Sequence, residues 1–247
     1  MHLHQFFVNH TQIKDNKIFI KGNDARHISG VLRLLPGDHI KVVDKSGNRY
    51  NAVISSLCKD LITSKIVTFE KITSPKIKLN LYSCILKGEA WDHVLKKGTE
   101  LGVAGFIPVI SERTIIKIKT EEREQKLLRW EKIVHEAAKQ CKRIDIPFIL
   151  PIKSFKDAVK LRNTNELNLI FWEEEKYISL KKIFPLGKAI DNINIFVGPE
   201  GGFTEDEIKL AQDAGIKTVS LNSNILRADT AAICAIAVLF YEINDFR

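Results

Sequence analysis

Hydrophobic and polar residues are spaced in two different patterns along the 247-residue chain. In its first part, apolar and β-branched residues alternate with polar ones in short runs, a pattern that predicts strands. Turn sequences at Pro36–Asp38 and Lys45–Asn48 separate the runs. A short helix, capped by Asn23 or Asp24, is expected to end near Leu32. The predicted strands are Lys17–Ile20, His39–Val43, Arg49–Ser56 and Leu61–Phe69.

From Lys76 onward the pattern changes to strands that alternate with amphipathic helices. This alternation predicts an α/β domain with a mainly parallel sheet, whereas the short strands before it suggest a small barrel. The boundary is expected at Ser74–Pro75, which gives two domains, 1–74 and 75–247. Strands are expected at Lys78–Leu86, Phe106–Ile110, Leu167–Trp172, Ile193–Val197 and Lys217–Leu221, and helices at Glu89–Leu101, Glu121–Cys141, Ser154–Leu161, Ile178–Phe184, Glu205–Ala214 and Thr230–Ile243.

The last predicted helix lacks a polar face over most of its length. Residues Ala231–Phe240 are all apolar, and a helix that is apolar all round must be buried on every side. A terminal helix normally faces water on one side. We therefore expect this helix to be covered twice, by the sheet and by a partner subunit.

Composition argues against several classes of protein. The chain is 45% hydrophobic and 28% charged, which is normal for a globular protein. Its longest apolar run, Ala231–Tyr241, has 11 residues and is too short to span a bilayer. The first residues lack the features of a secretory signal. The four cysteines include no CxxC pair, which is typical of reduced thiols in a cytosolic protein. No histidines have metal-ligand spacing, so no metal site is expected.

The net charge of +8 favours a polyanionic partner. The surplus gathers in two segments. Residues 1–74 carry 11 Lys and Arg against 6 Asp and Glu, and Arg113–Arg143 carries 10 against 5. Separated basic segments are typical of contacts to a nucleic-acid backbone, although a solvated surface also explains a run of charge.

Three loops at predicted strand ends carry the candidate chemistry, because ligands of open α/β sheets bind at the carboxyl ends of the strands. The first follows Trp172, and the second is Gly198–Thr204. The second loop matches neither the Walker A motif nor the dinucleotide fingerprint, so we do not expect it to cradle phosphate. Its glycines permit close backbone approach, although such turns are often merely structural. Glu200 favours a neutral nucleoside or a cationic centre such as a sulfonium.

The third loop, Leu221–Thr230, places Ile225 and Leu226 in a polar turn directly before Arg227. The two aliphatic residues either plug the core beneath the last helix or form an apolar wall against a flat ring such as adenine. Asp229 is expected to cap the final helix.

Five segments together resemble a known family. GPEGGFTEDE (198–207) and LNSNILRADTA (221–231) resemble the cofactor signature of the SPOUT methyltransferases, and more narrowly of the RsmE-type 16S ribosomal RNA (uracil-N3) methyltransferases. HISGVLRLLPGD (27–38), KKGTELGVAGFIPVISER (96–113) and RWEKIVHEAAKQCKR (129–143) fit the same family. The resemblance covers nearly the whole chain. Two positions depart from the pattern: Asn222 stands where glycine is usual, and Asp229 where glutamate is usual.

The resemblance implies a PUA-like RNA-binding barrel, 1–74, and a SPOUT domain with a trefoil knot, 75–247. It implies a cytoplasmic homodimer that uses S-adenosylmethionine to methylate N3 of a uridine in 16S ribosomal RNA, within the small ribosomal subunit. The cofactor-binding residues would be Phe171, Trp172, Val197, Gly198, Pro199, Gly201, Gly202, Leu221, Asn222, Ile225, Leu226 and Thr230.

Two residues would carry the chemistry in this interpretation. Arg227 would hold the target base and stabilise charge on the uracil oxygens, and Glu200 would be a base or a neighbour of the sulfonium. The alternatives are a SPOUT methyltransferase acting on another RNA or on a ribose 2′-hydroxyl, and a non-catalytic RNA-binding protein that retains the fold. The residues expected to contact RNA are Arg26, His27, Arg33, Arg113, Arg129 and Arg143.

Overall fold

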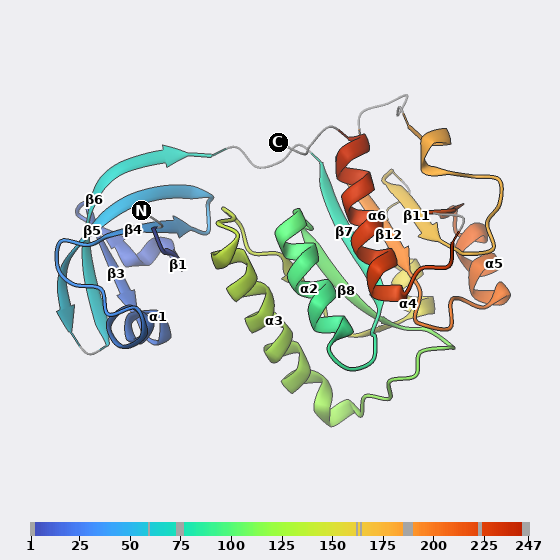
Figure 1. Ribbon diagram of the computed structural model, residues 1–247, viewed down its shortest axis with the longest axis horizontal. Coiled ribbons are helices and arrows are strands. Elements are labelled where there is room, and N and C mark those ends of the chain that lie inside the picture. Colours follow the sequence, from blue (N-terminus) through green and yellow to red (C-terminus); the bar gives the residue numbers. More distant parts are fainter. Residues whose placement is uncertain are drawn as a thin grey trace. The chain divides into compact units, whose positions relative to one another are not determined.

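The chain divides into two compact units, coloured from blue to red along the sequence in Figure 1. A computed structural model describes residues 3–58, 60–72, 77–161, 163, 165–184, 190–221 and 224–243. The first unit is Met1–Ser74 together with Ala138–Ile146, and the second is Pro75–Ala137 together with Pro147–Arg247. The predicted boundary at Ser74–Pro75 lies outside the described residues.

The described part of the first unit is built on one sheet with the strand order β1-β4-β5-β6-β3-β2. Its neighbours pair antiparallel, except β1 and β4, which run parallel. The four predicted strands are confirmed, while β1 and β2 were not predicted. The strands are β1 (Gln5–Val8), β2 (Ile13–Lys14), β3 (Lys17–Lys21), β4 (His39–Asp44), β5 (Asn48–Cys58) and β6 (Leu61–Lys71).

A short helix follows β3, as predicted, but its cap differs from the prediction. Helix α1 (Asn23–Arg26) continues as one turn of π-helix, His27–Val31. The residue before α1 is Gly22, whose φ of 69° is left-handed, so a glycine conformation replaces the side-chain cap expected from Asn23 or Asp24.

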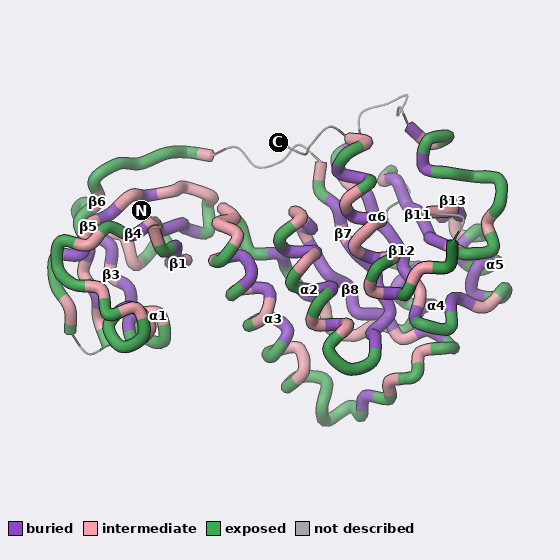
Figure 2. The backbone as a smooth tube through the Cα atoms, in the orientation of Figure 1, coloured by how far each residue is buried: buried purple, intermediate pink, exposed green. Residues whose placement is uncertain are grey.

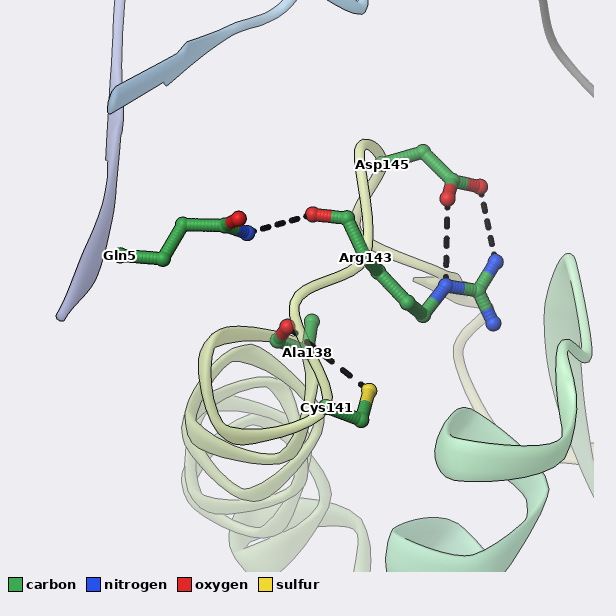
Figure 3. A network of polar contacts seen from close by, with 5 residues as sticks. All are labelled: Gln5, Ala138, Cys141, Arg143 and Asp145. Carbon is green, nitrogen blue, oxygen red and sulfur yellow. Dashed lines mark hydrogen bonds and ion pairs between the residues drawn. The ribbon is translucent and has the colours of Figure 1, made fainter. Parts of the chain in front are cut away.

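A segment distant in sequence completes the first unit. Helix α3 (Arg123–Gln140) ends in residues that belong to this unit rather than to the second one. The Gln5 amide donates a hydrogen bond of 2.6 Å to the carbonyl oxygen of Arg143, whose side chain pairs with Asp145 (Figure 3). Lys139 also forms an ion pair of 2.6 Å with Asp24. Ala138–Ile146 therefore joins strands that lie more than a hundred residues earlier.

The second unit contains a parallel sheet with the order β10-β8-β7-β12-β11-β13, and β9 also pairs with β8. Its central strands are buried on both faces, as the purple segments of Figure 2 show, which explains their nearly continuous apolar sequences. The strands are β7 (Lys78–Cys84), β8 (Gly105–Ile110), β9 (Phe148–Ile149), β10 (Lys153–Ser154), β11 (Leu167–Phe171), β12 (Asn192–Val197) and β13 (Lys217–Val219).

Helices cover the two faces of this sheet and form separate cores. Trp91 of α2 and Ile236 of α6 pack in one cluster with Leu81 of β7. Phe155 of α4 and Ile208 of α5 pack in the other. The helices are α2 (Ala90–Leu101), α4 (Phe155–Lys160), α5 (Glu205–Asp213) and α6 (Ala228–Glu242).

Three asparagines in register link the central strands of the sheet. The Asn80 amide donates to the side-chain oxygen of Asn194 at 3.0 Å, and the Asn194 amide donates to that of Asn168 at 2.9 Å. Asn194 also donates to Glu166 at 2.7 Å. Because buried amides must be paired, this ladder penalises any slip between β7, β12 and β11.

The structure corrects two predictions in the second half of the chain. The helix expected at Ile178–Phe184 is a single 3-10 turn, Leu180–Lys182. Helix α6 begins at Ala228 with Arg227 as its N-cap residue, so Asp229 is not the cap. Its carboxylate instead accepts the backbone N–H of Thr230 at 2.9 Å.

Helix α6 is also less buried than its composition predicts. Ala232, Ala235 and Leu239 have no exposed surface, yet Val238 is 38% and Tyr241 is 71% exposed. The described residues of this chain therefore bury one side of α6 and leave the other side partly exposed to solvent. No helix in the described part of the chain is long and apolar enough to cross a membrane.

Candidate functional site

The carboxyl ends of β7, β11, β12 and β13 surround one cavity of about 440 Å³ in the second unit. Parallel strands place all of these ends at the same edge of the sheet. Backbone and apolar side chains form most of the wall, and charged side chains reach it from three of the loops. The lining residues are Leu86, Ala90, Phe171, Trp172, Glu173, Val197, Gly198, Pro199, Glu200, Gly202, Ser220, Leu221, Asn224, Ile225, Leu226, Arg227, Ala228, Asp229 and Ala231.

Most of the predicted cofactor residues meet at this cavity, and so do Arg227 and Glu200. Gly201 lies in the second loop and Thr230 in the first turn of α6, but neither lines the wall, and Asn222 lies outside the described residues. Sequence reasoning missed the contribution of Leu86 and Ala90, which follow β7. Leu86 stands at the end of the predicted strand Lys78–Leu86, which was the available signal, but the sequence did not reveal that this strand neighbours β12.

The glycine loop, Gly198–Thr204, makes a tight turn in which the N–H of Gly202 donates to the carbonyl of Pro199 at 3.0 Å. Gly202 has a φ of 69°, a left-handed conformation that favours glycine. A Cβ at this position would also overlap the carboxylate of Glu173. Gly202 is therefore required for both its backbone conformation and its lack of a side chain.

Glu200 fastens the glycine loop to the loop after β7. Its Oε1 accepts the backbone N–H of Lys87 at 2.9 Å. The carboxylate is exposed and lines the cavity. Glu200 thus has a positioning contact through one oxygen, while its other oxygen accepts no hydrogen bond from the described residues.

The turn after β8 holds the other end of the glycine loop. The buried carboxylate of Glu207 accepts the backbone N–H of Glu112 at 2.9 Å and that of Thr204 at 3.1 Å. The second bond completes a capping box with Thr204 that begins α5. Arg113 donates to the carbonyl of Gly201 at 3.0 Å. Two consecutive residues of one turn therefore fix the loop of the next strand.

The loop before α6 exposes Ile225 and Arg227, whereas Leu226 is half-buried. Ile225 is 89% exposed, so it does not plug the core beneath the helix. The Arg227 side chain is 86% exposed, and its Nε lies 3.9 Å from Asp229. An exposed guanidinium beside an apolar cavity can reach a ligand that enters from solvent.

The candidate RNA residues of the first unit have different surroundings. Arg26 forms an ion pair of 2.7 Å with Asp60, and the His27 ring meets Phe6 edge-on. Arg143 pairs with Asp145. Arg33 is exposed, has a φ of 52° and forms no ion pair or hydrogen bond within the described chain.

The two candidate RNA arginines of the second unit both have partners. Arg113 binds the carbonyl of Gly201, and Arg129 forms a two-pronged ion pair with Asp92. These bonds orient the side chains and neutralise the charge of Arg129 locally. Arg33 is thus the candidate arginine with the least compensated charge.

The described residues also bear on two other kinds of chemistry, metal binding and nucleophilic attack by a cysteine. No group of three or more His, Cys, Asp and Glu side chains in these ranges could hold a metal ion. Burial raises the pKa of the Cys84 thiol to about 12, so this cysteine stays protonated and is a poor nucleophile.

Comparison with known proteins identifies both units. The model of an RNA methyltransferase domain matches residues 73–240, and that of an RNA methyltransferase PUA domain matches residues 20–67. The chain is 29% identical over 258 residues to ribosomal RNA small subunit methyltransferase E of Bacillus subtilis (strain 168), covering 99% of each chain. It is 30% identical over 241 residues to the Rickettsia conorii protein of the same name, covering 96% of this chain and 95% of that one.

Solved structures agree with the sequence relatives. Ribosomal RNA small subunit methyltransferase E from Neisseria gonorrhoeae, bound to S-adenosyl methionine, has a TM-score of 0.86 and 30% identity, covering 97% of this chain and 98% of that one. The Legionella pneumophila protein Lpg2936, in complex with the same cofactor, has a TM-score of 0.87 and 26% identity, covering 98% of each chain.

The contacts of Glu207 predict a loss of stability when its carboxylate is removed. In Glu207→Gln the side chain keeps one acceptor oxygen but turns an NH₂ group toward the second backbone N–H. We expect the free energy of unfolding in urea to fall by about 1–3 kcal/mol. Glu205→Gln is the control, because it removes an exposed carboxylate from the same helical turn. Equal losses in the two variants would assign the effect to the helix dipole instead.

Proposed function

Because the chain belongs to the ribosomal RNA small subunit methyltransferase E family, we propose that it transfers a methyl group from S-adenosylmethionine to N3 of one uridine in 16S ribosomal RNA. One observation carries the proposal beyond the family match. Two signature segments that are separate in the sequence, 198–207 and 221–231, line the same cavity. The RNA substrate would be met within the small ribosomal subunit, in the cytoplasm.

The cavity fits this cofactor in size and in chemistry. Its volume of about 440 Å³ lies in the range of small-molecule sites. Apolar side chains such as Phe171 and Leu226 suit a flat adenine ring, and the carboxylates suit a sulfonium. The bound cofactor supplies a methyl group activated by that sulfonium. Its proposed binding residues remain the predicted set, with Leu86 and Ala90 added from the other side of the cavity.

Arg227 and Glu200 are the residues proposed to act on the target base. N3 of uracil lies on the Watson–Crick edge, so the base must be unpaired and must lose its N3 proton. Arg227, exposed at the edge of the cavity, would bind the uracil oxygens and stabilise the negative charge that forms there. Glu200 would accept the proton through the oxygen that Lys87 does not engage.

The role of Arg227 predicts a separation of catalysis from cofactor binding. Arg227→Ala is expected to lower kcat by about 10²–10³-fold, the usual effect of losing one group that stabilises developing charge. The affinity for S-adenosylmethionine, measured by calorimetry, should stay within about twofold of the wild type, because the guanidinium is largely solvated.

Mass spectrometry of the methylated nucleoside tests the reaction itself. N3-methyluridine is the expected product, whereas a ribose-methylated product would support the alternative acting on a 2′-hydroxyl.

A normal rate in Arg227→Ala would remove this residue from the mechanism. Arg227→Lys retains the charge but loses the planar fork, and it should recover only part of the activity.

The first unit is proposed to hold the RNA. The PUA model matches its residues 20–67, and its basic surplus suits a phosphate backbone. Arg33 stands out because its backbone is held in a conformation that non-glycine residues rarely adopt. The other proposed contacts are Arg26, His27, Arg113, Arg129 and Arg143.

Salt dependence of RNA binding tests this assignment. Removing one phosphate contact to single-stranded RNA should reduce the slope of log affinity against log salt by about 0.7. We expect this change in Arg33→Ala. Arg129→Ala should change the slope less, because Asp92 already compensates the charge of Arg129. An unchanged slope in Arg33→Ala would exclude Arg33 from the RNA contact.

We also propose that the chain forms a homodimer through the exposed side of α6, and that the second unit contains the trefoil knot of the SPOUT fold. Apolar side chains on this side, including Val238 and Tyr241, remain open to solvent in one chain. A partner covering them would satisfy the all-apolar sequence of the helix. In such a dimer α6 would be covered by its own sheet on one side and by the partner on the other, so neither side of the helix needs polar residues.

Sedimentation equilibrium tests the dimer. The wild type should have twice the chain mass of 28.1 kDa, whereas Tyr241→Glu should be a monomer because it buries a charge in the contact. Tyr177→Glu, which changes another largely exposed tyrosine outside α6, is the control and should remain a dimer. A Tyr241→Glu protein that stays dimeric would place the contact elsewhere.

A further inference from the structure

Three consecutive glutamates leave β11, and the structure gives each a different environment. Glu175 is held by the fold, since it accepts the N–H of Tyr177 at 2.8 Å and the hydroxyl of Thr218 at 2.7 Å. Glu174 is exposed and does not line the cavity. Glu173 lines the cavity, and its carboxylate lies against the α-carbon of Gly202. The sequence Glu-Glu-Glu alone does not distinguish these roles.

Glu173 is the cavity carboxylate that the described chain leaves uncompensated. Glu200 accepts a hydrogen bond from Lys87, and Asp229 accepts one from Thr230 and lies near Arg227. Glu173 forms no hydrogen bond or ion pair with the residues that the structure describes. Glu173 is an exposed residue, and a carboxylate without a partner in the cavity wall favours a ligand that brings a positive charge.

The position of Glu173 depends on the glycine loop. Gly202 leaves the space that the carboxylate occupies, and a side chain there would push the carboxylate out. The carboxylate is therefore fitted between two loops that both line the cavity. This packing keeps the carboxylate in the cavity wall, where it is open both to solvent and to a bound ligand.

We propose that Glu173 makes the cavity discriminate by charge between the methyl donor and its product. The inference rests on the proposed function. S-adenosylmethionine carries a sulfonium. When the methyl group leaves, the bonding electron pair stays on sulfur, and S-adenosylhomocysteine has a neutral thioether instead. The two molecules differ only at the sulfur, in the methyl group and in the charge, and a carboxylate in the cavity wall responds to the charge. Loss of the attraction to Glu173 then favours release of the product.

Calorimetry on three proteins tests this discrimination. The wild type, Glu173→Gln and Glu174→Gln are titrated with S-adenosylmethionine, with S-adenosylhomocysteine, and with sinefungin, which carries an ammonium in place of the sulfonium. In Glu173→Gln the affinity for the two cationic ligands should fall about fivefold to tenfold, as expected for one partly solvated charge pair. The affinity for S-adenosylhomocysteine should change less than about twofold. Raising the salt concentration should shrink the difference between ligands in the wild type.

Glu174→Gln is the matched control, because it removes the neighbouring charge from outside the cavity wall, and all three affinities should match the wild type. Glu173→Gln preserves the shape of the side chain and breaks no hydrogen bond, so its melting temperature should also match. Equal weakening of the donor and the product would overturn the proposal and leave Glu173 a packing residue. Unchanged affinities, or the same change in Glu174→Gln, would overturn it as well. Wild-type protein that binds none of the ligands would refute the proposed cofactor itself.

Discussion

Parallel pairing of β7, β12, β11 and β13 is the constraint on which the site depends. Each of these strands ends at the same edge, so loops that are distant in sequence meet around one cavity. Helices bury both faces, which leaves the strand ends as the accessible part of the sheet. The amide ladder through Asn194 penalises a shifted register. A slip of even one residue would reverse the facing of every side chain in the strand.

The glycine loop is held by polar bonds as well as by the packing of Phe203 in the core. Glu207 joins the start of α5 to the turn after β8, and Glu200 reaches the loop after β7. Glu207 accepts two backbone N–H groups and Glu200 accepts one, and these bonds confine the loop without filling the space beside it. The cavity therefore has room for a ligand. The charged side chains of Glu173 and Arg227 are available to interact with it. A rigid frame with uncompensated charges is what a binding site for a charged small molecule requires.

Local sequence patterns predicted the elements well because each reports a nearby contact. The alternation in β4 and the apolar run of β12 follow directly from one-sided and two-sided burial. Strand order involves distant pairs, so Leu86 could not be assigned to the cavity from sequence. A 3-10 turn at Leu180–Lys182 replaces the helix predicted at Ile178–Phe184, because a segment of two turns is too short for its own pattern to stabilise a helix. The role of Glu173 depends on its contact with Gly202, which no periodicity encodes.

The segment Ala138–Ile146 has a consequence for the order of events during synthesis. Residues 1–74 leave the ribosome first, but Gln5 and Asp24 lack their partners until Arg143 and Lys139 have also emerged from the exit tunnel. The first unit therefore cannot complete its folding while only residues 1–74 have been synthesised. Its completion waits for a stretch of chain that includes β7, β8 and nearly all of α3. A fragment cut at residue 74 would lack this segment and its contacts with Gln5 and Asp24.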